Sequence, residues 1–136
     1  MTARYAYVDT SCLVAIAFEE SDVEGLAQRL GSYDRLVSSN LLEAEFRAAL
    51  VREEVEAGET LLSPLTWIFP NRPLSQESRR VQAHGYVRGA DLWHLACALY
   101  LAGDDVGGLV FETLDQRQSE VAASLGFRPS DREEPP

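Results

Sequence analysis

Residues 4–18 read RYAYVDTSCLVAIAF, and this stretch decides the fold because a strand passes directly into a helix. The run at 4–8 is rich in β-forming residues and predicts a short strand. Asp9 comes next, and Thr10 and Ser11 can open a helix through the apolar residues that follow. We therefore expect Asp9 at the carboxyl end of a strand, beside two hydroxyl groups that favour a polar site.

The alternation of strands and helices continues along the chain. Pro64 and Pro70 interrupt an apolar run, so residues 60–70 predict a short helix and then an extended piece. Because strands alternate with helices, we expect an α/β fold in which helices cover a parallel sheet. Ligands of such sheets bind outside the carboxyl ends of the strands, where Asp9 and Asp115 fall. The other predicted strands span 35–38, 108–113 and 127–129. A second helix is predicted to end at residue 30, and further helices are predicted over 39–57, 75–84, 89–102 and 115–125.

The length and composition of the chain are those of a globular protein. Its 136 residues suggest one domain at 1–128, followed by a disordered tail at 129–136. No apolar run approaches the roughly 20 residues of a membrane span, and no signal peptide is visible, so we expect a cytoplasmic protein without membrane contact. Cys12 and Cys97 are flanked by apolar residues, which indicates buried, reduced thiols.

The charge is strongly negative. The net charge is −10, and every basic residue is an arginine. This balance argues against a protein that coats nucleic acid, which would carry a basic face. It does not exclude an enzyme that uses a few local arginines and a metal ion. Part of the acidity lies in the DREEPP tail and in Glu53, Glu54 and Glu56, which we interpret as solvated surface.

Glu45 is the most informative acid. A carboxylate buried without a partner becomes protonated or costs several kcal/mol. Glu45 therefore needs a cation or a wet pocket, unless it is a boundary residue whose carboxylate reaches water. Its neighbours three and four residues away on the predicted helix are all apolar, which places it on the face that packs against the core: Leu41, Leu42, Ala48 and Ala49.

Three aspartates have ordinary local roles as alternatives. Asp91 begins an apolar helix, where aspartate is a common N-cap. Asp115 also suits an N-cap, and Gln118 three residues later completes a capping-box pattern. Asp9 precedes two hydroxyl residues, either of which could cap the first helix instead. Taken one at a time, these aspartates need no further explanation.

The combination of acids indicates a metal site. Asp9, Asp91 and Asp115 lie at strand ends or helix starts, and Glu45 lies on an apolar helix face. If the four converge, their repulsion raises their pKa values unless a cation neutralises them. Oxygen ligands favour Mg²⁺ or Mn²⁺ over zinc. Such an ion can activate water and stabilise charge on a phosphodiester oxygen, which predicts hydrolysis without a covalent intermediate.

Four motifs stand in a recognisable order: YVDTSCL (7–13), SSNLLEAEFRAALVR (38–52), VRGADLWHLACAL (87–99) and FETLDQRQSEVAASLGF (111–127). They resemble the four motifs of PIN-domain nucleases: a strand and turn, an acid on a long helix followed by an apolar residue and Arg, Asp-x-x-His-Leu-Ala, and Thr-x-Asp before a helix. The resemblance covers nearly the whole chain, whose short length is similar to that of VapC-type toxins of prokaryotic toxin–antitoxin pairs.

The resemblance implies a three-layer α/β/α sandwich and a Mg²⁺- or Mn²⁺-dependent endoribonuclease, often acting on tRNA or rRNA. It also implies a homodimer and a cognate antitoxin that blocks the site. The family's acids fall on Asp9, Glu45, Asp91 and Asp115, which makes these the expected catalytic and metal-binding residues. Ser11 or Thr10 matches the hydroxyl that supports the first motif.

Two positions depart from the family pattern. Glu43 is a rival to Glu45, although Arg47 four residues later suits Glu43 for an ordinary surface pair. Arg117 stands where some members carry a further acid, so one or two metal ions remain possible.

Basic and aromatic residues around the third motif have two interpretations. Arg79, Arg80 and Arg88 flank it and are candidates for binding RNA phosphates, the alternative being a solvated helix face. His94 shares a helix face with Asp91, and we expect a packed, hydrogen-bonded histidine rather than one at the edge of the pocket.

Three other functions compete with that of a nuclease. A phosphoryl-accepting switch domain also uses an acidic pocket with Mg²⁺, but it needs a lysine near the phosphoryl group, and this chain has none. A dehalogenase-like phosphatase needs Asp-x-Asp, but residue 11 is Ser. A non-catalytic domain that binds a partner stays open, because a complete set of acids shows capacity and not turnover.

Overall fold

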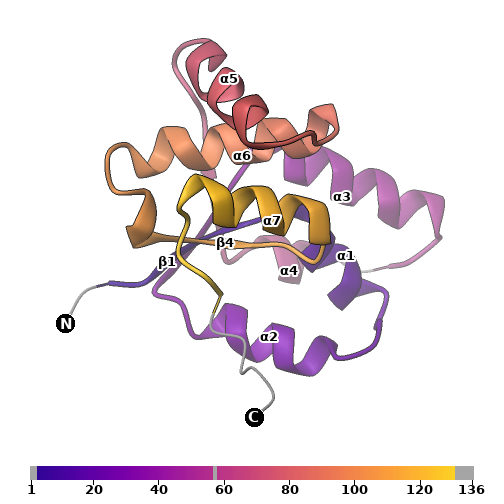
Figure 1. Cartoon of the computed structure of the whole chain (residues 1–136). Helices are drawn as coiled ribbons and strands as arrows, with labels where there is room; N and C mark the ends of the chain where they lie inside the picture. Colours follow the sequence, from indigo (N-terminus) through magenta and orange to yellow (C-terminus); the bar gives the residue numbers. More distant parts are fainter. Residues whose placement is uncertain (1–2, 57, 131–136) are drawn as a thin grey trace.

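The computed structural model describes residues 3–56 and 58–130 and contains a parallel sheet with helices on both faces (Figure 1). Its strands lie in the order β3-β2-β1-β4, and all three neighbouring pairs are parallel. The predicted α/β fold is confirmed. Of the tail predicted to be disordered, 129–136, residues 131–136 lie outside the described part. The strands are β1 (Tyr5–Val8), β2 (Arg35–Ser39), β3 (Leu65–Ile68) and β4 (Leu109–Glu112).

The helices cover the two faces of the sheet in two groups, α1 to α4 on one side and α5 to α7 on the other (Figure 1). A short 3₁₀ turn, η1 (Val106–Gly108), leads into β4. The three-layer sandwich is therefore confirmed. The helices are α1 (Thr10–Ala17), α2 (Val23–Gly31), α3 (Asn40–Arg52), α4 (Glu59–Leu62), α5 (Ser75–His84), α6 (Gly89–Ala102) and α7 (Gln116–Leu125).

Side chains of the strands alternate between the two cores, as the period of two in a strand requires. Tyr7 and Phe111 are buried with residues of α5, α6 and α7. Ala6, Val8 and Val110 are buried with residues of α1, α2 and α3. The predicted burial of the cysteines is confirmed, since both thiols are free and buried, Cys12 in the second core and Cys97 in the first.

The long helix predicted over 39–57 is shorter in the structure, because α3 ends at Arg52. Glu54 takes a positive φ of 53°, and the N–H of Val55 donates to the carbonyl of Leu50 at 2.9 Å, which closes the helix. Val55 then packs against the core. A helix that continued to residue 57 would place glutamates in its last turn, against the negative end of the helix dipole, so the glutamate run favours this early end.

Two smaller predictions differ from the structure. Gly58 does not end α3 but precedes α4, with a φ of 125° that a side chain rarely adopts. A Cβ there would lie 3.0 Å from Leu50 Cδ1, so the turn also needs the space. The last strand predicted at 127–129 is reduced to one bridge between Val110 and Arg128.

The order of the strands places a topological switch point between β1 and β4, which is the place where the strand order reverses direction. The chain passes from β1 to β2 on one side, and β4 returns to the other side of β1. The N–H of Asp9 donates to the carbonyl of Glu112 at 2.9 Å, which joins the carboxyl ends of these two strands. In open parallel sheets this is where ligands bind.

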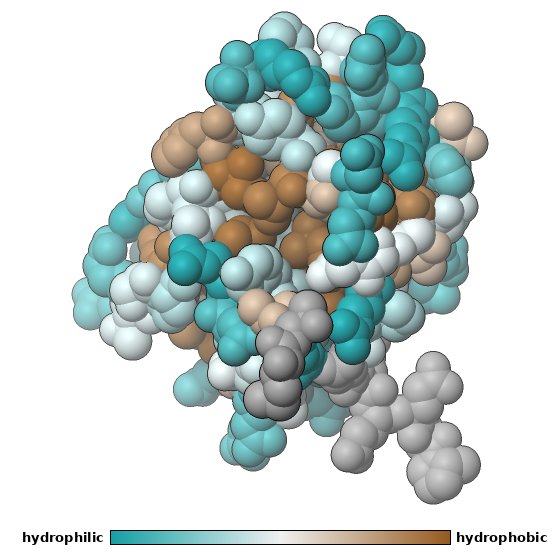
Figure 2. All heavy atoms as spheres, turned by 90° about the vertical axis from the view of Figure 1, so that its left-hand side faces the viewer, coloured by the Kyte–Doolittle hydropathy of each residue, from teal (hydrophilic) through white to brown (hydrophobic). Residues whose placement is uncertain are grey.

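The opposite end of the sheet, where the strands begin, is hydrophobic. Figure 2 looks onto the amino ends of the strands, where hydrophobic side chains gather within a hydrophilic rim. Tyr5 at the start of β1 and Leu101 at the end of α6 are exposed. No helix within 3–56 and 58–130 has the length and apolarity to cross a membrane.

Candidate functional site

Four acids predicted from the sequence lie at the carboxyl ends of the strands, and we call this group the acidic edge: Asp9, Glu45, Asp91 and Asp115. Asp9 lies at its centre. It follows β1, caps α1, and is only 4% exposed. Its Oδ2 accepts a hydrogen bond from the N–H of Ser11 at 3.1 Å and lies 3.3 Å from the hydroxyl oxygen of Thr113. Its Oδ1 accepts a hydrogen bond from Nε2 of Gln118 at 3.4 Å. Asp9, and neither hydroxyl residue after it, is therefore the cap of α1.

Asp115 caps α7, as the sequence predicted. Its Oδ1 accepts the N–H of Gln118 at 2.7 Å. Only half of the predicted capping box forms, because the N–H of Asp115 donates to the hydroxyl of Thr113 instead, at 3.0 Å. The side chain of Gln118 is thereby free to point into the site, where it contacts Asp9 and Asp91.

Asp91 lies in the first turn of α6 and is not its N-cap, so the capping alternative is wrong for this residue. Arg88 holds the N-cap position, and α6 begins at Gly89. The pKa of Asp91 is raised, first by burial of its side chain and then by the negative charges of Asp9 and Asp115. The nearby positive charge of Arg88 opposes this shift only in part. The three aspartates are therefore neighbours that repel one another.

Glu45 reaches the same edge from α3. Its Oε1 accepts hydrogen bonds from Thr10 Oγ1 at 2.7 Å and His94 Nε2 at 2.9 Å. These contacts, the one from His94 first, lower the pKa of Glu45 against the opposing effect of burial. The side chain of Glu45 is 33% exposed, so its carboxylate is hydrogen-bonded and also reaches solvent. Ala48, one of its apolar neighbours on the helix, is exposed as well.

His94 is buried between two layers, and its tautomer follows from its partners. The hydroxyl oxygen of Tyr7 accepts the N–H of Ser39 at 3.1 Å and lies 2.7 Å from His94 Nδ1. Burial raises the pKa of Tyr7, so its proton stays and donates to Nδ1. Nε2 then carries the histidine proton and donates to Glu45. The expected packed histidine is confirmed, and it also touches the edge of the acidic site.

Ser11 ties the first helix to the last. Its Oγ accepts the N–H of Leu114 at 3.0 Å and lies 3.4 Å from Thr113 Oγ1. Thr10 instead serves Glu45, as described above. The hydroxyl of Thr10 thus supports Glu45, whereas that of Ser11 holds the residues that follow β4.

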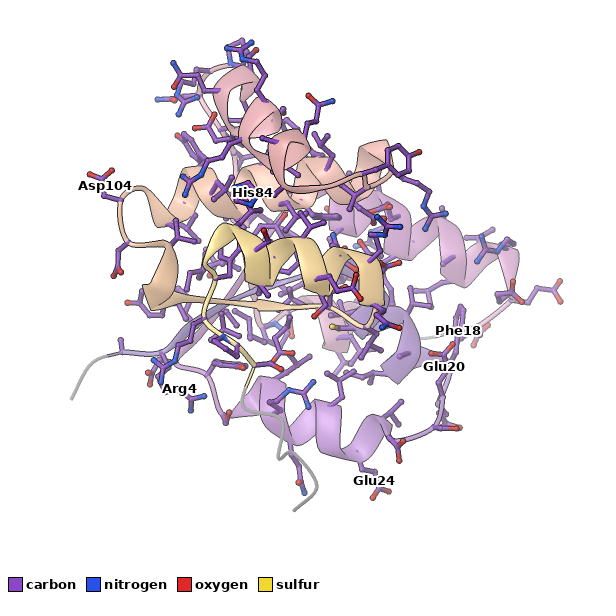
Figure 3. All side chains as sticks on the ribbon, in the orientation of Figure 1. Arg4, Phe18, Glu20, Glu24, His84 and Asp104 are labelled. Atoms are coloured by element: carbon purple, nitrogen blue, oxygen red, sulfur yellow. The ribbon has the colours of Figure 1, made fainter. Side chains whose placement is uncertain are left out.

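The competing acids of the sequence are accounted for. Glu43 forms a surface pair with Arg47 at 2.9 Å, so it does not contribute to the acidic edge. Glu20, Glu24 and Asp104 point outward from the molecule, with Asp104 just beyond the end of α6 that lies away from Asp91 (Figure 3).

The arginines proposed to hold phosphates are all exposed. Arg88 Nε lies 3.7 Å from Asp91 Oδ2, which places one guanidinium beside the acids. Arg79 and Arg80 lie on α5 and form no ion pair with any residue in the described part of the chain. Their role in binding RNA stays a prediction.

A separate buried acid lies at the end of β4. Glu112 is 1% exposed, and its carboxylate accepts hydrogen bonds from Arg29 Nε at 2.9 Å, Arg29 Nη2 at 3.2 Å and the Tyr33 hydroxyl at 2.6 Å. This cluster joins α2 to the sheet. Its charge is balanced within the protein.

The donor chemistry of the aspartates fits a hard divalent cation. Carboxylate oxygens are the ligands that Mg²⁺ and Mn²⁺ prefer, and a cation would offset the repulsion that raises the pKa of Asp91. Within 3–56 and 58–130, however, no three His, Cys, Asp or Glu side chains are arranged as a ready ligand group. Oxygens of Asp9 and Asp115 accept hydrogen bonds from the protein.

Sequence reasoning missed two polar residues of the site. Thr113 and Gln118 are both buried and contact Asp9. A signal for Gln118 was present, because it lies on the buried face of α7 with Val121, Ala122 and Leu125. A polar residue on an apolar helix face needs a partner, and this argument, applied to Glu45, applies equally to Gln118.

Comparison with known families and proteins gives one match. A family model described as PIN domain matches residues 6–124. No curated protein and no solved structure matches the chain.

Proposed function

The chain belongs to the PIN-domain family, whose members are generally nucleases, and we propose that it is a metal-dependent endoribonuclease that hydrolyses RNA phosphodiester bonds. One observation carries the proposal. Asp9, Asp91 and Asp115 come from three distant parts of the chain and meet at one place, where burial first and then the charges of Asp9 and Asp115 raise the pKa of Asp91. Such repulsion at a sheet's switch point indicates a site for a cation.

The acids of the site would have different roles in hydrolysis. Asp9, Asp91 and Asp115 would hold Mg²⁺ or Mn²⁺, which supplies an activated water and stabilises charge on a phosphodiester oxygen. Glu45 keeps its negative charge through Thr10 and His94, and would orient the attacking water, because a carboxylate with a lowered pKa is a weak base.

Around these acids, Arg88 is placed to bind the phosphate, because it stands exposed beside Asp91. One basic side chain and a cation would then offset the repulsion between RNA and an acidic protein.

The narrower proposal is a VapC-type toxin of a prokaryotic toxin–antitoxin pair. The short chain and the order of its motifs support it. A cytoplasmic homodimer, tRNA or rRNA as the substrate, and a cognate antitoxin that covers the acids belong to this proposal. A short neighbouring gene that encodes a DNA-binding protein would support the toxin, and an isolated gene would favour RNA processing.

The test uses the full chain with tRNA and rRNA in Mg²⁺ or Mn²⁺. We expect cleavage that EDTA stops. Asp9→Asn and Asp91→Asn should each lower the rate at least about 100-fold, the upper range for residues that only support a metal's ligands. The matched control is Asp104→Asn, which removes an exposed acid just beyond the far end of α6 and should cleave normally.

Cleavage that persists in EDTA, or in both aspartate variants, would contradict the proposal. Thermal unfolding of each variant shows that the fold is kept. If the wild type cuts none of these RNAs with either metal, the non-catalytic alternative of a partner-binding domain replaces the nuclease.

A further inference from the structure

One neutral side chain lies among the three aspartates. Gln118 is fully buried on α7. Its Nε2 lies 3.4 Å from Asp9 Oδ1 and 3.3 Å from the main-chain carbonyl of Asp91, and its own N–H binds Asp115 Oδ1 at 2.7 Å. The side chain of Gln118 therefore joins the carboxylate of Asp9 to the backbone of Asp91, and its backbone N–H holds the carboxylate of Asp115.

The orientation of this amide follows from its neighbours. The hydroxyl oxygen of Thr113 accepts the N–H of Asp115 at 3.0 Å, and its own proton is directed to Gln118 Oε1 at 2.7 Å. This contact is shorter than the 3.3 Å from the same hydroxyl to Asp9. With Oε1 accepting, the amide must turn its NH₂ group toward Asp9 and Asp91.

A neutral amide suits this position for an electrostatic reason. A glutamate here would add a fourth negative charge, and an arginine would pair with the acids in the way that Arg29 pairs with Glu112. An amide instead donates two hydrogen bonds and leaves the negative charge uncompensated. The acids are held in place while their charge stays available to a cation.

We infer that Gln118 is the positioning residue whose side chain holds the carboxylate of Asp9 against the start of α6, beside Asp91, for a divalent cation. The inference rests on the proposed function, because it assigns the aspartates to that cation. Since Gln118 is fully buried, it acts on the aspartates and does not touch RNA.

The test compares Gln118→Met with Gln116→Met. Methionine has a similar length and lacks the amide donors, and Gln116 is an exposed glutamine of the same helix. Titration calorimetry with Mn²⁺ alone, without RNA, should show binding that is about 10- to 100-fold weaker in Gln118→Met, as is typical for residues that orient metal ligands. Gln116→Met should bind Mn²⁺ as the wild type does.

Kinetics add a readout that a merely structural role would not move. In Gln118→Met, kcat at a fixed low Mn²⁺ concentration should fall and recover at high Mn²⁺, while KM for RNA stays unchanged. A loss of kcat that excess Mn²⁺ does not restore overturns the inference.

A measurement on the wild type covers the case in which the variant does not fold. Addition of Mg²⁺ to ¹⁵N-labelled protein should shift the side-chain amide resonance of Gln118 and leave that of Gln116 in place. An unchanged Gln118 resonance on saturation overturns the inference, as does a folded Gln118→Met that binds Mn²⁺ normally. If the wild type binds neither ion, the proposed function fails first, so the two failures are distinguishable.

Discussion

Two groups of acids lie near the end of β4, and they differ in whether a buried arginine balances their negative charge. Glu112 is buried against Arg29 and Tyr33, so its charge is matched within the protein. Asp9 and Asp115, which lie just beyond it, are held by backbone N–H and amide donors. The first arrangement is complete, whereas no buried arginine pairs with the second in the described part of the chain, and His94 Nε2, 3.9 Å from Asp9 Oδ1, lies closer to Glu45 at 2.9 Å. Charge balance therefore separates the acid that stabilises the fold from the acids that suit a cation.

The largest expected effect breaks the matched cluster. Arg29→Met leaves the carboxylate of Glu112 buried without its cation, and we expect a loss of about 3–5 kcal/mol in the free energy of unfolding. Urea denaturation at pH 7 measures it. The control is Arg47→Met, which breaks the exposed pairs with Glu43 and Glu59 and should cost far less. Equal losses in the two variants would mean that the Glu112 pair is not structural.

A smaller effect is expected for Glu45, the one acid of the site with a lowered pKa. Its ionised form is stabilised in the fold, so this contribution is present above the ordinary pKa of glutamate and is lost as the pH falls through the lowered value. Glu45→Gln in EDTA should cost about 1 kcal/mol at pH 7, discounted for the exposure of the side chain. Denaturation at pH 7 and pH 3 checks this, and a loss of equal size at pH 3 would contradict it.

The smallest effect has the opposite sign. The raised pKa of Asp91 means that the folded protein holds this proton more tightly than the unfolded chain. Ionisation therefore costs stability as the pH rises, and the cost is full above the raised pKa. Asp91→Asn in EDTA should gain under about 1 kcal/mol at pH 7 and nothing at pH 3. A variant less stable than the wild type at pH 7 would show that Asp91 is not repelled.

Local patterns of sequence placed most of the elements and the acids. The helices at 75–84 and 89–102 were predicted with their observed bounds, because Gly85 and Gly103 follow them with positive φ. Asp9 and Asp115 were placed at strand ends and helix starts, since these positions depend only on neighbouring residues.

The rest depends on contacts between distant segments. Glu112 finds Arg29 83 residues away, and no local pattern indicates that pairing. Gln118 looked like half of a capping box, but its side chain turns to Asp9, which lies 109 residues away. The early end of α3 has the same cause, because Val55 folds back onto the core. Tertiary packing decided each of these cases.

The two cysteines offer a separate view of each layer of the sandwich. Cys12 and Cys97 lie on opposite faces of the sheet, and burial raises the pKa of both thiols, that of Cys97 to about 12. Alkylating reagents attack the thiolate, so neither residue reacts while its layer is closed. Pulsed alkylation followed by peptide mass mapping would therefore report the opening of each helical layer independently, and would show which layer yields first.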